Sequence, residues 1–144
     1  MGRQSVSMQD PKNLAVSARA IELALAVYRL TQEFPADERF GLTAQMRRAA
    51  VSVGSNIAEG CGRWSKREFL QFLQVAYSSA AELAFQLGIV TQLDLGRPAD
   101  REHVAGLVDQ VQRMLNRLMV AKRATLKGER SSPTSPLVSH QTRA

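Results

Sequence analysis

The sequence has few of the residues from which covalent cross-links and metal sites are built. Its 144 residues include one cysteine, Cys61, and two histidines, His103 and His140. A single thiol excludes an intrachain disulfide. Neither histidine follows a glutamate by three residues, which excludes the Glu-x-x-His pattern of a di-metal helical bundle. The sequence therefore predicts no metal and no cofactor, and Cys61 is expected to be a small, partly buried helix residue.

Long apolar runs are also missing. No run approaches the length of about 18 residues that a transmembrane helix needs. The first twelve residues are polar and lack the apolar centre of a signal peptide. We therefore expect a cytoplasmic protein without a membrane partner, of a length that suits one domain with its own core.

Acidic residues are outnumbered, with 13 Asp and Glu against 19 Lys and Arg, and the excess is local. Residues 42–67 contain five basic residues and one acidic residue, whereas residues 68–99 contain one basic and three acidic. A basic cluster suggests an anionic partner such as nucleic acid, although it can also be an ordinary solvated face. The candidate nucleic-acid-binding residues are Arg47, Arg48, Arg63, Lys66 and Arg67.

Strand-like alternation is absent, and apolar residues recur at helical spacing over residues 13–34, 42–61, 65–95 and 100–126. Pro35 ends the first segment, and Ser65 with Glu68 forms a capping box at the start of the third. Short connections between long amphipathic helices indicate an all-α, antiparallel up-down-up-down four-helix bundle over residues 13–126. Residues 1–12 and 127–144 are expected to form a disordered arm and tail.

The first and third helices carry apolar residues on two sides. The expected core face of the first helix consists of Leu14, Ala18, Ile21, Leu25 and Tyr28. A helix that is apolar on a second side needs a second partner, which is either the rest of the bundle or another subunit. We expect a homo-oligomer, with an interface that includes Leu23, Val27, Leu30, Leu70, Phe85 and Ile89.

Polar residues flank the apolar face of the second helix at steps of three and four, and a similar row lies on the third helix. Because polar groups beside a core must be hydrogen-bonded, we expect the two rows to meet. The expected buried network consists of Ser52, Asn56, Glu59, Ser79, Glu82 and Gln86. Such a network fixes helix register, or it orients the outer arginines toward phosphates.

Two further features admit alternatives. Arg97 precedes His103 by six residues, which resembles the Arg-to-His spacing of a class of helical-bundle ribonucleases; the alternative is a solvated histidine in a first helical turn. Trp64 follows Arg63 in a predicted turn. It is suited either to stacking on a base or to anchoring the turn or an interface.

The stretch Arg47-Arg48-Ala49-Ala50-Val51-Ser52-Val53-Gly54-Ser55-Asn56-Ile57-Ala58-Glu59-Gly60 resembles the bacterial four-helix-bundle family of 23S ribosomal RNA intervening-sequence proteins. Flanking matches are Tyr28-Arg29-Leu30-Thr31, Phe34-Pro35, Phe40-Gly41-Leu42, Arg63, Ser65, Glu68-Phe69-Leu70 and Glu82-Leu83. The resemblance covers residues 13–119 and departs at Val53-Gly54-Ser55, where the family often has a proline.

The resemblance implies a cytosolic bundle that assembles as a ring, a homopentamer. It also implies kinship with the accessory variability determinant protein of diversity-generating retroelements, a basic barrel that partners nucleic acid and a reverse transcriptase. We therefore expect a non-enzymatic oligomer that binds structured RNA or DNA through its basic residues. The alternatives are a scaffolding oligomer with a protein partner and a ribonuclease that uses Arg97 and His103.

Overall fold

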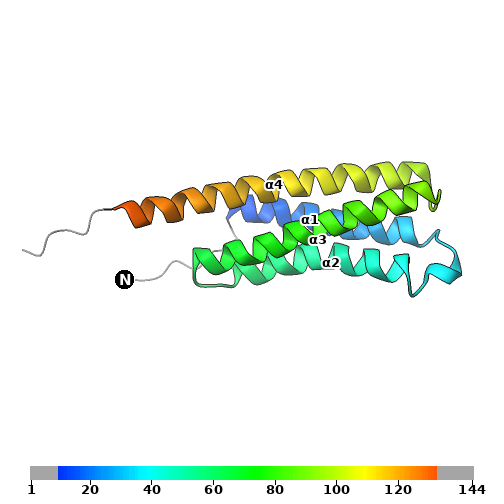
Figure 1. The fold of residues 1–144 in the computed structure, drawn as a ribbon, viewed down its shortest axis with the longest axis horizontal. Coiled ribbons are helices and arrows are strands. Elements are labelled where there is room, and N and C mark those ends of the chain that lie inside the picture. The colour runs from blue at the N-terminus through cyan, green and yellow to red at the C-terminus, as the bar shows by residue number, and fades with distance from the viewer. Residues whose placement is uncertain (1–9, 133–144) are drawn as a thin grey trace, which may run out of the picture.

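The computed structural model describes residues 10–132, which contain four α-helices, one short 3-10 turn and no strand. The elements are α1 (Pro11–Thr31), η1 (Ala36–Glu38), α2 (Leu42–Cys61), α3 (Lys66–Gln92) and α4 (Pro98–Ser131). The four helices lie alongside one another along the long axis of the molecule (Figure 1). The predicted all-helical class is confirmed for these residues. Of the predicted arm over residues 1–12 and tail over residues 127–144, residues 1–9 and 133–144 lie outside the described residues. Pro11 and Lys12 belong to α1, so the prediction of a disordered arm is wrong for these two residues.

Local sequence signals set the helix ends. The Asp10 carboxylate accepts a 2.9 Å hydrogen bond from the Lys12 amide, and Pro11 occupies the first position of α1. The Ser65 hydroxyl accepts the amide of Glu68 at 3.1 Å, as the capping box predicts. α2 closes on Gly62, whose amide donates to the carbonyls of two residues in the last turn of the helix.

Each helix packs against two others. α1 and α3 both contact α2 and α4, and the helices of each diagonal pair face each other across the core. Contacts at the helix ends connect the elements: Arg97 at the start of α4 pairs with Glu33 after α1 at 3.0 Å, and Lys66 at the start of α3 pairs with Glu129 near the end of α4. The start of α3 and the end of α4 therefore share one end of the bundle.

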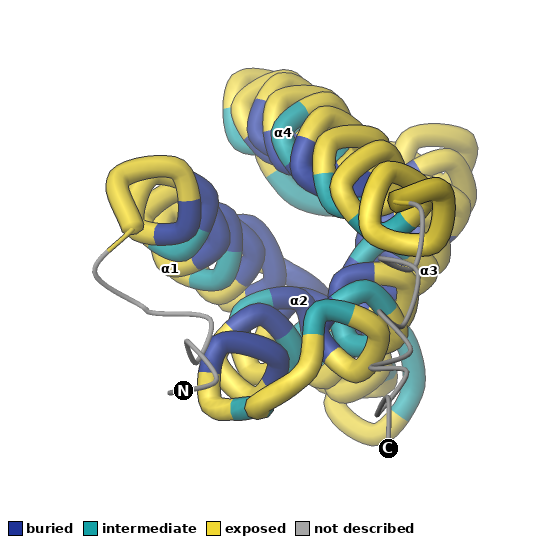
Figure 2. Tube along the Cα trace, turned by 90° about the vertical axis from the view of Figure 1, so that its left-hand side faces the viewer, coloured by how far each residue is buried: buried dark blue, intermediate teal, exposed yellow. Residues whose placement is uncertain are grey.

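α1 buries the face opposite to the predicted one. Leu23, Val27 and Leu30 are fully buried in the core of the single chain, so their assignment to an interface between subunits is wrong. The expected core residues Leu14, Ile21, Leu25 and Tyr28 are instead 46–62% exposed. Figure 2 shows the buried side of α1 turned toward the other helices and its exposed side turned outward.

Small residues lie where the buried face of α1 packs against α2. Ala20 lies on the buried face, and a Cβ added to Gly54 of α2 would be 3.6 Å from the Ala20 Cβ. The two helices therefore approach closely at this point, which a bulkier pair would prevent. The hydrophobic periodicity was equally good on both faces of α1, but only one face offers this contact.

α4 continues beyond its predicted end at residue 126. It remains helical to Ser131, so residues 127–131 do not belong to the disordered tail that we expected. Lys127, Glu129 and Arg130 have good helix propensity, and the first proline after them is Pro133. α4 has 34 residues, compared with 27 in α3 and about 20 in each of the others, so its last turns carry mainly exposed side chains.

No helix within residues 10–132 is both long enough and apolar enough to cross a bilayer.

Candidate nucleic-acid interface

Polar side chains connect α2 and α3 at the centre of their contact. The hydroxyl oxygens of Ser52 and Ser79 lie 2.9 Å apart, within hydrogen-bonding distance. The Asn56 amide nitrogen donates to the Ser52 hydroxyl at 3.0 Å and to the Ser52 carbonyl at 2.8 Å. These three predicted network residues therefore form one cluster, which gives the α2–α3 contact a specific register.

The other three predicted network residues do not join this cluster by hydrogen bonds. Gln86 is buried one turn further along α3 from Glu82, and its amide nitrogen donates to the Glu82 carboxylate at 3.2 Å. The Gln86 amide oxygen has no partner among residues 10–132. Glu59 is exposed and pairs with Arg63 at 3.1 Å. The polar seam is thus made of three separate groups of contacts.

Arg47 is held between helices. Its Nε donates a 2.9 Å hydrogen bond to the Thr31 hydroxyl at the end of α1, and its guanidinium lies over the Tyr28 ring. The neighbouring Arg48 points to solvent and has no ion-pair partner among the described residues. The paired arginines therefore differ, because Arg47 ties α2 to α1 whereas Arg48 is exposed.

Arg63 and Lys66 are also engaged by neighbours. The Arg63 guanidinium lies 4.8 Å from the Phe72 ring centroid in addition to its ion pair with Glu59. Lys66 pairs with Glu129, as described above. Of the three cations at this end of α2, only Arg67 is exposed and lacks a carboxylate partner within residues 10–132.

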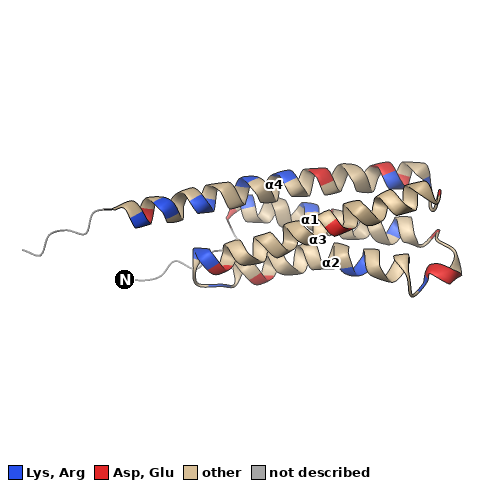
Figure 3. Cartoon of the chain, in the orientation of Figure 1, with Lys and Arg blue, Asp and Glu red and all other residues tan. Residues whose placement is uncertain are grey.

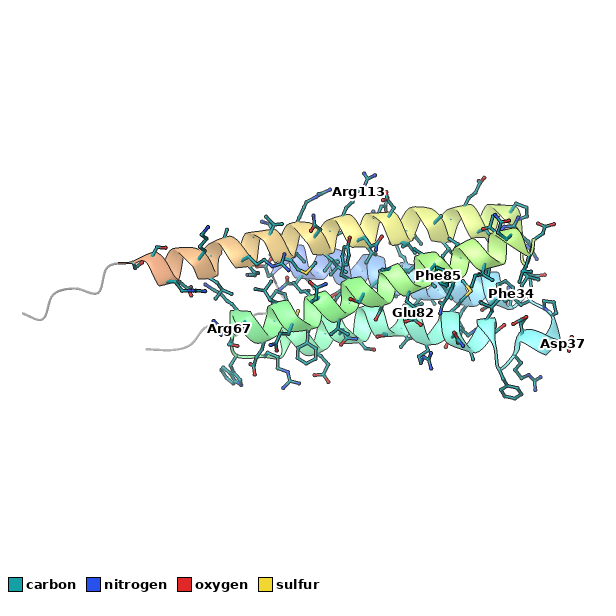
Figure 4. The ribbon with its side chains drawn as sticks, viewed as in Figure 1. Phe34, Asp37, Arg67, Glu82, Phe85 and Arg113 are labelled. Atoms are coloured by element: carbon teal, nitrogen blue, oxygen red, sulfur yellow. The ribbon has the colours of Figure 1, made fainter. Side chains whose placement is uncertain are left out.

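The five predicted binding residues do not form one patch. Cys61, at the end of α2, follows Arg48 by thirteen positions of helix, which corresponds to about 20 Å. Arg47 and Arg48 therefore lie near one end of the bundle, and Arg63, Lys66 and Arg67 lie near the other. Figure 4 shows Arg67 at the end opposite to Phe34 and Asp37.

A basic groove that the sequence reasoning missed surrounds Arg67. It is lined by Arg67, Arg123, Leu126, Lys127, Glu129, Arg130 and Ser131. Lys and Arg residues accumulate on the last turns of α4 and the first turn of α3, at the same end of the molecule (Figure 3). The single carboxylate in the groove, that of Glu129, is paired with Lys66.

The spacing of three basic residues in the sequence indicates the α4 side of this groove. Arg123, Lys127 and Arg130 are spaced by four and three residues, so a continuous helix places them on one face. Because residues 127–144 were expected to be disordered, this spacing was not used. Arg123 donates to the Gln74 amide oxygen of α3 at 3.3 Å, which holds the α4 stripe beside α3.

Apolar side chains also remain on the outside of α3. Phe85, Ile89 and Leu93 are exposed at successive turns, with Phe85 at 72% exposure, whereas Leu70 is half-buried against the core. α1 carries its own outward apolar stripe of Leu14, Ile21, Leu25 and Tyr28. Since α1 and α3 are diagonal to each other in the bundle, these two outward stripes lie on opposite sides of it.

The remaining chemically reactive residues are dispersed. The Arg97 guanidinium is turned to Glu33, whereas His103 lines a shallow hollow between α1 and α4 that does not include Arg97. No group of three or more His, Cys, Asp or Glu side chains within residues 10–132 is placed to hold a metal ion. Burial raises the pKa of the Cys61 thiol, the Asp10 carboxylate raises it further, and Lys122 acts in the opposite direction.

Comparison with known proteins identifies the family. The model of the family described as 23S rRNA-intervening sequence protein matches residues 12–117, which is most of the chain. The chain belongs to this family. A crystal structure of a protein of unknown function from the S23 ribosomal protein family of Bacteroides thetaiotaomicron VPI-5482 has a similar fold, with a TM-score of 0.67 at 20% sequence identity. The similarity covers 75% of this chain and 97% of that chain. No curated protein matches the sequence.

The residues matched by the family model include only part of the lining of the basic groove. Arg67 lies within the matched residues 12–117, whereas Arg123, Lys127 and Arg130 lie beyond them. The polar cluster of Ser52 and Asn56 lies inside the matched range. In this 23S rRNA-intervening sequence protein, the groove thus combines a residue of the shared bundle with residues from the extension of α4.

Proposed function

We propose that this protein is a non-enzymatic subunit of a homo-oligomer that binds RNA or DNA through the basic groove between α3 and α4. The observation that carries the proposal is the set of four cations, Arg67, Arg123, Lys127 and Arg130, that face one groove and have no carboxylate partner within residues 10–132. Phosphate oxygens are the ligands that such a set favours. Lys66 contacts the groove through its ion pair with Glu129, whereas Arg47, Arg48 and Arg63 do not line it.

The electrostatic part of this proposal is tested by the salt dependence of binding. Four phosphate contacts predict a slope of log affinity against log salt of roughly −3 to −4. Affinity is measured by fluorescence anisotropy with labelled oligonucleotides at several salt concentrations.

The double variant Arg67→Glu, Lys127→Glu should abolish binding at moderate salt. A matched control, Arg29→Glu with Arg39→Glu, makes the same change of net charge near the opposite end and should bind far better. Equal loss in both variants contradicts a local site.

The outward apolar stripes support self-association. A surface that contains Phe85, Ile89 and Leu93 is costly to leave in water, and the α1 stripe is its counterpart on the opposite side of the bundle. Contact between two different surfaces of identical chains is head-to-tail, and it produces a ring when the rotation closes. We infer an up-down-up-down bundle that closes into such a ring in the cytoplasm, with five subunits as the family resemblance implies.

Sedimentation velocity tests the assembly. The native chain should sediment as a closed oligomer of about five subunits, and Phe85→Glu or Ile21→Glu should yield smaller species because each places a charge in one of the two stripes. Leu23→Glu is not an informative variant, since Leu23 belongs to the core of the single chain. A native chain that sediments as a monomer contradicts the assembly.

The apolar stripe on α1 also supports a second candidate, a scaffolding oligomer whose partner is another protein. Leu14, Ile21 and Leu25 would then bind an amphipathic helix of that partner in place of the α3 stripe of a neighbouring subunit. The double variant of Arg67 and Lys127 separates the two candidates. Loss of nucleic-acid binding with an intact oligomer supports the first candidate, whereas absence of any nucleic-acid binding by the native oligomer supports the second.

A further inference from the structure

We propose that Trp64 is a base-stacking residue, so that the ligand of the basic groove is a nucleic acid with unpaired bases, a single-stranded RNA or DNA segment. This inference rests on the function proposed above and names the class of ligand. It starts from the position of Trp64 in the short connection between α2 and α3.

The Trp64 side chain is 68% exposed, although tryptophan is the most costly aromatic residue to leave in water. It therefore does not anchor the turn against the core of the single chain. Its backbone is nevertheless well fixed, because Gly62 caps α2 two residues before it and Ser65 caps α3 immediately after it. A ring that is exposed on a fixed backbone loses little conformational entropy when it binds a flat ligand.

The surroundings of Trp64 suit a nucleotide. Trp64 precedes Arg67 by three residues, so the two Cα atoms are no more than about 11 Å apart. A base on the ring would thus have phosphates of its own strand within reach of the groove cations. Phe40 is more exposed than Trp64, but it closely follows Asp37, which lies at the end of the bundle opposite to Arg67 (Figure 4).

The stacking geometry selects unpaired bases. In a duplex the faces of the bases are covered by their neighbours, and only base edges are accessible in the grooves. In a single strand the faces are available, and an aromatic side chain beside a basic groove stacks on them without regard to sequence. A groove that used phosphate contacts alone would bind duplex and single strand alike.

Trp64 is the single tryptophan of the chain, so its own fluorescence reports on the contact. The intact oligomer is titrated with a single-stranded oligonucleotide, the matching duplex and an abasic oligonucleotide of equal length. We expect only the single-stranded oligonucleotide to quench tryptophan emission strongly.

Trp64→Ala should weaken single-strand binding roughly 5- to 150-fold, as loss of one stacked base predicts, and leave abasic binding unchanged. Trp64→Phe should retain most of the affinity, and Phe40→Ala should retain all of it.

The outcomes separate the stacking proposal from the function on which it rests. Equal single-strand affinity in Trp64→Ala and the native protein overturns the stacking role, while salt-dependent binding would still support the groove. Insensitivity of binding to Arg67→Glu with Lys127→Glu overturns the groove itself. A Trp64→Ala protein that sediments as a smaller species places the ring in a subunit contact, which also overturns the stacking role.

Discussion

The guanidinium group of Arg47 lies over the ring of Tyr28, with 4.4 Å between the guanidinium carbon and the ring centroid. The Arg47 Nε also donates to the Thr31 hydroxyl, which in turn donates to the Val27 carbonyl at 2.8 Å. The first arginine of the Arg47-Arg48 pair is therefore a link between α1 and α2. An arginine guanidinium is suited to binding phosphate, but the contacts of Arg47 with α1 give it a structural role.

Arg47→Ala should lower the free energy of unfolding by about 1–2 kcal/mol, through loss of the hydrogen bond and the cation–π contact. Affinity for nucleic acid should stay unchanged. The adjacent Arg48→Ala is the matched control and should change stability by less than about 0.5 kcal/mol. Urea unfolding measures both. A stable Arg47→Ala protein that no longer binds nucleic acid would reverse our assignment.

Gly60 lies at a close contact between α2 and α3. A Cβ at this position would come within 2.9 Å of the Phe72 Cβ and 3.0 Å of a ring carbon of Phe69. Gly60→Ala should therefore destabilise the fold by about 1–3 kcal/mol, because neither neighbour can move without repacking the core.

Gly106 is the control for that substitution. It lies inside α4, where an added Cβ meets no atom within 4 Å. Gly106→Ala should stabilise the protein by up to about 1 kcal/mol, which is the difference in helix propensity. Thermal unfolding of the two variants should show shifts of opposite sign, and a shift of the same sign would contradict the packing at Gly60.

The hydrogen bond between Ser52 and Ser79 should be measurable as a coupling energy. Single and double replacement of these serines by alanine should give a coupling of about 0.5–1.5 kcal/mol in a double-mutant cycle. Ser78→Ala provides a reference, since Ser78 is exposed on α3 and should show no coupling with Ser52. Additive effects of Ser52→Ala and Ser79→Ala would mean that the two hydroxyls do not interact in solution.

Cys61 gives a prediction about pH. Because burial raises the pKa of its thiol, the folded chain retains this proton at a pH where the unfolded chain, with a thiol pKa of about 8.5, has lost it. The stabilisation is complete below that pH and declines as the pH rises toward the folded pKa. Relative to Cys61→Ala, the native protein should thus lose stability above about pH 8.5. A difference between the two proteins that is constant from pH 7 to 10 would contradict this.

The limits of sequence reasoning appear most clearly in α1. Ile21 and Leu25 on one face are as apolar as Leu23 and Val27 on the other, so periodicity indicated two buried faces and could not rank them. The choice depends on the contact of Ala20 with Gly54, which is between residues 34 positions apart. By contrast, the capping box at Ser65 defines the start of α3 locally, and this boundary was predicted well. α1 ends at Thr31, three residues before the end at Phe34 that Pro35 led us to expect.

The candidate site was harder to predict because charge alone does not distinguish cations that contact other residues of the chain from cations that are free to bind a ligand. Arg63 and Arg67 look alike in the sequence, yet Arg63 is engaged by Glu59 and Phe72 while Arg67 is exposed. The contribution of α4 was missed because the Ser- and Pro-rich composition after residue 130 was extended back over residues 127–130. Composition averages over a window, whereas a helix ends at a particular residue.

The position of the basic groove at one end of the bundle has a consequence for the proposed ring. Cyclic symmetry repeats each atom at the same height along the rotation axis, so the Arg67 and Lys127 side chains of all subunits would form a single circle. One nucleic-acid strand that spans neighbouring grooves would then bind each further groove at a high effective concentration. A groove that is weak in one subunit could therefore hold a long strand tightly through avidity, and short oligonucleotides would dissociate quickly from the same assembly.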